Sequence, residues 1–93
     1  MRFVVSMVIA VAASTVAPPA LASRICHSLW FERAAIYKDA GLCFKTERAI
    51  NYFGNAGCSY DDERDVPLTP RARARIEELF AKERAHRCGG WWW

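Results

Sequence analysis

Four cysteines constrain this chain more than any other feature of its sequence. They stand at positions 26, 43, 58 and 88 of a chain of 93 residues. A domain of this size buries too little apolar surface to be comfortably stable through packing alone. An even number of cysteines in a small exported chain is typical of a disulfide framework. We therefore expect the fold to depend on disulfide bonds.

Four cysteines allow three pairings, and the sequence alone does not select one of them. The nested pairing, Cys26 with Cys88 and Cys43 with Cys58, would tie the two ends of the domain together and close one central loop. We favour it for that reason, and the other two pairings stay open. Zinc binding is the alternative use of the thiols. Structural zinc sites usually draw ligands from short CxxC pairs, and the sequence has none.

The first 22 residues have the three-part pattern of a secretory signal peptide. Arg2 precedes an apolar run over residues 3–17, two prolines follow, and Ala20-Leu21-Ala22 forms a small-x-small cleavage site. A membrane anchor is the alternative, but a helix that spans a bilayer needs about 20 apolar residues, and this run is shorter. We expect cleavage after residue 22, no membrane span in the mature chain, and a periplasmic or secreted location.

Cleavage would leave one small domain with little net charge. Removing 22 of the 93 residues leaves 71, and the loss of Arg2 lowers the formal net charge from +3 to +2. So small an excess gives no electrostatic reason to expect a nucleic-acid partner, although Arg71, Arg73 and Arg75 stand close together. The length excludes a Rossmann domain or a barrel, and the P-loop, GxSxG, HExxH and EF-hand signatures are absent.

Hydrophobic spacing and capping residues predict a mainly α fold, a small disulfide-stapled domain of about three short helices with long loops. The first helix is expected from Ser28, as its cap, to about residue 40. Its apolar stripe would hold Leu29, Ile36 and Ala40, with Trp30 and Tyr37 beside the stripe. Gly41 suits the left-handed residue that ends such a helix.

Two further helices are expected to begin at threonine caps. Thr46 precedes a short helix that runs to Phe53. Thr69 and Pro70 begin a third helix that runs to about Arg87. Residues 59–68 would form a loop rich in acidic side chains, without the ligand spacing of a calcium loop.

A Gly-Gly pair and three tryptophans follow the last cysteine, so we divide the chain into a signal peptide (1–22), a disulfide-stabilised domain (23–88) and a tail (89–93). We expect the indoles of the tail to be exposed. Indole rings favour interfaces where one side is apolar and the ring N–H finds a partner. The tail is therefore a candidate interaction segment, formed by Trp91, Trp92 and Trp93. The alternative is a terminal extension without function.

Two strings and several single residues carry a family resemblance. The strings are CFKT at 43–46 and FGNAGCSYD at 53–61, and the single residues are Arg33, Ile36, Tyr37, Gly41, Phe44, Tyr52 and Phe53. In these features the chain resembles the YARHG domain, a short bacterial domain, in its cysteine-containing single-domain version with a signal peptide. Tyr37 and Gly41 match the naming pentapeptide, whose middle three residues are replaced by Lys-Asp-Ala at 38–40.

The resemblance implies an envelope or secreted location, a structural role for the motif residues Arg33, Tyr37, Gly41 and Phe44, and no established activity. We expect no enzyme, no cofactor and no metal site. A loose metal site at His27 and His86 is the alternative, because the outer disulfide would bring these histidines to one end of the domain.

The function we expect is a small non-catalytic domain that binds or stabilises an unknown cell-envelope component or protein. The alternative is a small inhibitor or effector that acts on an envelope enzyme or on a competing cell.

Overall fold

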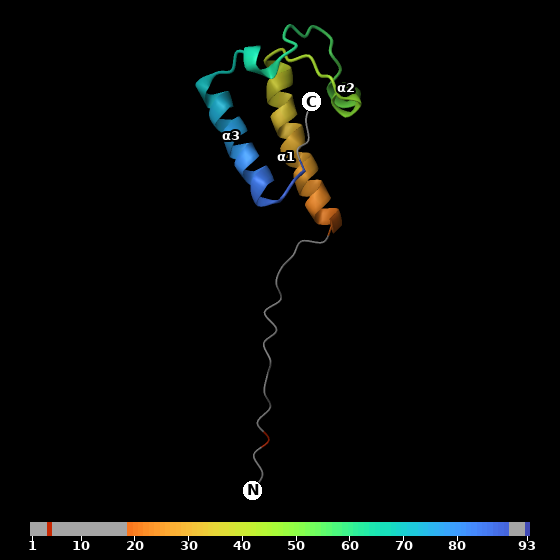
Figure 1. The fold of residues 1–93 in the computed structure, drawn as a ribbon, viewed down its shortest axis with the longest axis vertical. Helices are drawn as coiled ribbons and strands as arrows, with labels where there is room; N and C mark the ends of the chain where they lie inside the picture. The colour runs from red at the N-terminus through yellow and green to blue at the C-terminus, as the bar shows by residue number, and fades with distance from the viewer. Residues whose placement is uncertain (1–3, 5–18, 90–92) are drawn as a thin grey trace.

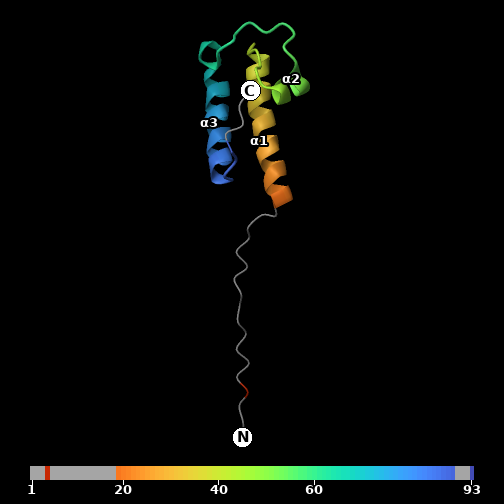
Figure 2. The same ribbon diagram turned by 45° about the vertical axis from the view of Figure 1, so that its right-hand side comes forward.

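The computed structural model describes residues 4, 19–89 and 93. Helix α1 (Pro19–Asp39) is followed by α2 (Glu47–Phe53), a 3-10 turn η1 (Glu63–Asp65) and α3 (Pro70–Ala85). α3 lies along one side of α1 and the short α2 lies on the other side (Figures 1 and 2). Within these described residues the only β pairing is one isolated bridge. The predicted mainly α fold of three helices and two disulfides is confirmed.

α1 is longer than the sequence led us to expect. It begins at Pro19, and Ser28 is an exposed residue in its interior, so the predicted cap at Ser28 is wrong. Proline is well tolerated at the first position of a helix, and no further proline or glycine occurs before residue 41 to stop the helix from extending.

Most of the predicted signal peptide lies outside the described residues, but its last four residues form the first turn of α1. None of residues 19–22 is buried, and the buried residues of α1 begin at Cys26. Cleavage after residue 22 would therefore remove no part of the core.

The two predicted threonine caps are confirmed. The Thr46 hydroxyl accepts a hydrogen bond from the backbone N–H of Ala49 at 3.2 Å, and the Thr69 hydroxyl accepts one from Ala72 at 3.1 Å. α3 ends at Ala85, two residues earlier than expected. Arg87 then adopts a left-handed conformation with φ 54°. This reversal ends the helix and directs Cys88 towards α1.

The core lies between α1 and its two neighbours. Trp30 and Ala34 are fully buried, whereas the expected stripe residues Leu29, Ile36 and Ala40 are only half-buried. The predicted stripe is therefore displaced, because α1 packs against α2 as well as α3 and its buried face points between them. The core cluster comprises Trp30, Ala34, Tyr37, Leu42, Phe44, Ala49, Val66, Ile76 and Trp93.

The cysteines form the nested pairing. Cys26 on α1 bonds Cys88 after α3, with 5.4 Å between their Cα atoms and a sequence separation of 62. Cys43 bonds Cys58 with 5.1 Å between Cα atoms and a separation of 15. On the chain-entropy account the outer bond stabilises the fold by about 4 kcal/mol and the inner bond by about 3 kcal/mol, as upper estimates.

None of the helices in the described part of the chain combines the length and the apolar character that a membrane crossing requires.

We predict that the two disulfides contribute separately to stability. Replacing Cys26 and Cys88 together by serine should lower the free energy of unfolding by about 4 kcal/mol, and the Cys43→Ser/Cys58→Ser pair by about 3 kcal/mol. Urea denaturation followed by circular dichroism measures both losses. Each double variant leaves no unpaired thiol, so disulfide exchange does not confuse the result. Wild-type denaturation midpoints in both variants would show that the fold does not depend on its crosslinks.

Candidate functional site

The first candidate region surrounds the motif residue Arg33 in the centre of the domain. Its side chain is only 1% exposed, and Nε donates a hydrogen bond to Oε1 of Glu83 at 3.0 Å. The guanidinium carbon lies 4.3 Å from the ring centroid of Phe80 and 4.0 Å from that of Trp93. A buried charge needs such partners, since burial without them is costly. Arg33 therefore joins α1 to α3 inside the core.

Trp93 lies in this region, so the expectation that it is exposed is wrong. Its side chain is 8% exposed, its ring centroid is 4.6 Å from that of Tyr37, and its indole N–H donates to Oε2 of Glu63 at 3.0 Å. An aromatic ring, a cation and an acceptor for the N–H together make burial of an indole favourable. Trp91 and Trp92 lie outside the described residues, and their role as an interaction segment stays a prediction.

The same surroundings change the pKa of the Tyr37 hydroxyl. Burial, and next the negative charge of Glu63, raise the pKa of Tyr37 above its ordinary value of about 10, against the opposing charges of Arg33 and Arg73. A phenol that resists ionisation suits a ring packed in a core, and nothing in this geometry activates it as a base.

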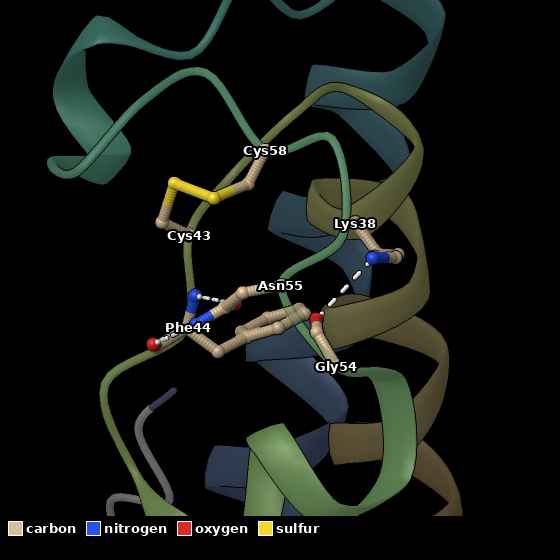
Figure 3. Close-up of a disulfide and its surroundings, with 6 residues drawn as sticks. All are labelled: Lys38, Cys43, Phe44, Gly54, Asn55 and Cys58. Carbon is tan, nitrogen blue, oxygen red and sulfur yellow. Dashed lines mark hydrogen bonds between the residues drawn. A yellow bond between two sulfur atoms is a disulfide. The ribbon is translucent and has the colours of Figure 1, made fainter.

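The other two motif residues hold the loop after α1. Gly41 has φ 101°, and a Cβ atom there would lie 3.3 Å from the ring of Tyr60, so the left-handed conformation that we predicted is confirmed. The backbone N–H and C=O of Phe44 both bond the side-chain amide of Asn55, at 2.7 and 2.9 Å. The Cys43–Cys58 disulfide lies beside this pair (Figure 3). All four motif residues thus contact other elements of the fold.

The second candidate region is a surface on α1 and α2 that we call the aromatic face, formed by Arg24, His27, Phe31, Arg48 and Tyr52. Phe31 and Tyr52 are 39% and 56% exposed. Their rings meet edge to face with 5.7 Å between centroids, and the His27 ring lies 5.4 Å from that of Tyr52. Large aromatic rings exposed together are typical of a surface that binds a protein, a membrane or a small ligand.

Arg48 connects the two helices that form the aromatic face. Its guanidinium carbon lies 4.3 Å from the ring centroid of the buried Trp30, and Nη2 donates a hydrogen bond to Nδ1 of His27. These contacts cross from α2 to α1. The two helices therefore present their exposed rings in one fixed arrangement.

Two shallow hollows lie on the aromatic face. The first has a volume of about 510 Å³ and is lined by His27, Ser28, Phe31, Glu32 and Ala35. The second, of about 460 Å³, is lined by Ser23, Arg24, His27, Ser28, Arg48 and Tyr52. His27 and Ser28 line both hollows, so the two adjoin along the exposed side of α1.

Positive charges outnumber negative charges among the residues that line these hollows. Glu32 accepts hydrogen bonds from Arg75 of α3 at 2.7 and 2.8 Å. These bonds, together with the one that Glu78 accepts from Arg75, raise the pKa of Arg75. Glu32 is the one acidic side chain that lines the hollows, and this ion pair balances its negative charge. The two arginines, Arg24 and Arg48, leave an excess of positive charge.

His27 and His86, the residues of the alternative metal site, have different surroundings. No group of three or more histidine, cysteine, aspartate or glutamate side chains able to hold a metal ion occurs among the described residues. His27 contacts the aromatic rings of the aromatic face, while His86 is an exposed residue at the end of α3. In the acidic loop, Asp62 binds Arg64, which lowers the pKa of Asp62 to about 2.

A comparison with models of protein families matches residues 5–84 to the YARHG domain. The chain belongs to the YARHG domain family. The match contains the four motif residues and covers α1, α2 and most of α3, while Cys88 and Trp93 lie beyond it. The family resemblance inferred from single residues and two short strings is therefore confirmed. No curated protein and no solved structure matches the chain.

Sequence reasoning missed the partners of the YARHG motif and most of the aromatic face. No sequence signal distinguishes Glu83 from the other charged residues of the third helix, and Phe31 lies outside the predicted stripe. The one available signal was the spacing of His27, Phe31 and Ala35, which places them on one side of a helix. The pairing of that side with Tyr52 depends on how α2 folds back.

We predict that Trp93 completes the core. Trp93→Ala should lower the free energy of unfolding by about 3 kcal/mol, because a buried ring is lost and Arg33 and Tyr37 lose a packing partner. Trp93→Phe is the matched control, since it keeps an aromatic ring but removes the N–H donor to Glu63, and should cost about 1 kcal/mol. Urea denaturation with both disulfides intact measures the difference. Equal stability of the wild type and the alanine variant would place Trp93 outside the core.

We also predict an alkaline loss of stability caused by Tyr37. Because the pKa of Tyr37 is higher in the folded than in the unfolded chain, its contribution is complete below about pH 10 and is lost as the pH rises through the folded-state pKa. Tyr37→Phe should flatten the fall in unfolding free energy above about pH 10, whereas Tyr52→Phe serves as the control on the exposed face. A wild-type pH profile in Tyr37→Phe would exclude this role.

Proposed function

We propose that this YARHG domain is an exported, non-catalytic module that binds a component of the bacterial cell envelope through the aromatic face. The observation that carries the proposal is the exposure of Phe31 and Tyr52 in a fixed arrangement beside two hollows. A rigid surface with exposed aromatic rings provides contact area at a low cost in side-chain entropy.

Export is supported by the disulfides and by the signal-peptide pattern. Disulfides form and persist in oxidising compartments and are rare in the cytoplasm, and all four cysteines are paired here. The pattern of residues 1–22 supports cleavage after residue 22. A periplasmic or secreted location of the mature domain is part of this proposal.

The absence of catalysis is proposed from the chemistry of the aromatic face. Its hollows contain one histidine, whose Nδ1 accepts a hydrogen bond from Arg48, and one carboxylate, which is held by Arg75. A nucleophile activated by an adjacent base requires a different arrangement. An inhibitor of an envelope enzyme remains the alternative, although the exposed rings lie on helices and not on a protruding loop that could enter a cleft.

The test is binding of the purified mature domain to isolated cell envelopes. We expect the wild type to co-sediment with envelopes, and Phe31→Ser/Tyr52→Ser to bind at least about tenfold less, because exposed rings that anchor an interface cost 1–3 kcal/mol or more when removed. Arg71→Gln, an exposed substitution on α3, is the control and should bind like the wild type. Intact mass of the exported chain should show that it begins at Ser23.

Three outcomes would contradict the proposal. Equal binding by the serine variant and the wild type would exclude the aromatic face. Release of soluble sugar or peptide from the envelopes by the wild type alone would contradict a non-catalytic role. An exported chain that retains residues 1–22 would contradict cleavage.

A further inference from the structure

We propose that the aromatic face binds an anionic sugar of the cell-wall glycan, an N-acetylated pyranose that carries a carboxylate. The sugar ring would lie against Phe31 or Tyr52, and its carboxylate would bind Arg24. This inference rests on the proposed function, since it names the ligand class for the same surface.

The shape of the face favours a discrete ligand over a membrane. Phe31 lines one hollow and Tyr52 lines the adjoining one, and their ring planes stand at 87° to each other. The rings therefore border shallow hollows on the surface, whereas docking on a lipid surface uses apolar side chains that extend into the headgroup region. Each hollow falls within the range of about 300–1,000 Å³ that is usual for small-ligand sites.

The charge of the face favours an anion. Arg24 is exposed, and it makes no hydrogen bond or ion pair with any residue that the structure describes. Its guanidinium has the planar geometry that binds a carboxylate through two parallel hydrogen bonds. Cleavage after residue 22, which we also propose, would add the α-ammonium group of Ser23 to the same hollow.

The secondary structure disfavours an extended peptide as the ligand. Peptides that bind by strand addition need the free edge of a sheet, and the aromatic face consists of α1 and α2, whose backbone groups bond within their helices. A bound amphipathic helix needs a continuous apolar groove, and here His27 and Ser28 lie between the two hollows. A sugar is bound by side-chain donors and ring faces alone, which is what this surface offers.

The experiment uses the disaccharide of N-acetylglucosamine and N-acetylmuramic acid as the probe, with titration calorimetry on the mature domain. N,N′-diacetylchitobiose, which has the same N-acetylated rings without the carboxylate, is the neutral control. We expect the neutral sugar to bind about tenfold more weakly, because a hydrogen-bonded charge pair contributes about 1.5 kcal/mol or more. Added salt should weaken binding of the anionic sugar only.

Two variants separate the contributions of charge and stacking. Arg24→Gln should lower the affinity for the anionic sugar about tenfold and leave that for the neutral sugar unchanged. Tyr52→Ser should weaken binding of both sugars. Arg71→Gln on α3 removes the same charge at a distance from the face and should bind like the wild type. Far-ultraviolet circular dichroism of each variant establishes that it is folded.

Several results would overturn the inference. Equal affinity for the two sugars, or wild-type affinity in Arg24→Gln, would exclude recognition of the carboxylate. Binding to phosphatidylglycerol vesicles that depends on Tyr52, without binding of the disaccharide, would assign the face to a membrane. Envelope binding that depends on Phe31 and Tyr52, with no affinity for either sugar, would leave the proposed function standing and would exclude this ligand.

Discussion

The buried guanidinium of Arg33 imposes the strongest condition on the fold. A cation removed from water must be matched by a carboxylate and by polarisable neighbours, and these come from distant parts of the chain: Glu83 and Phe80 on α3, and Trp93 beyond it. The packing of α1 against α3 and the position of the chain near Trp93 are therefore coupled. A change that separates the two helices exposes the pair to water or leaves a charge buried without its partner.

The YARHG motif and the aromatic face lie on different sides of α1 and have different physical roles. Arg33 and Tyr37 point into the core, and Gly41 and Phe44 hold the loop that the inner disulfide closes. Phe31 and Tyr52 remain exposed because α2 is too short to cover the outer side of α1. The family motif thus accounts for the architecture, and the binding that we propose involves residues outside it.

Local signals in the sequence predicted the elements of the fold well, because each depends on a few adjacent residues. The threonine caps at Thr46 and Thr69 and the left-handed Gly41 are of this kind. The start of α1 was mispredicted because Ser28 can cap a helix but can also lie within one. The burial of Trp93 was not predictable, since Trp93 comes after a Gly-Gly pair near the end of the sequence. The contacts of Arg33 were not predictable either, since they join it to residues 47 or more positions away in the sequence. The aromatic face was hidden for the same reason.

The nested order of the disulfides has a consequence for how the domain would mature during the export that we propose. A chain that crosses a membrane from its N-terminus presents Cys26 first, then Cys43, and only later Cys58 and Cys88. An oxidase that joins thiols as they emerge would link Cys26 to Cys43, which is not a bond of the folded domain. Thiol–disulfide exchange must then reshuffle the sulfurs, a process that takes seconds to hours without catalysis. Efficient export of this domain, which we propose, would therefore depend on a disulfide isomerase or on oxidation that is delayed until α3 has emerged.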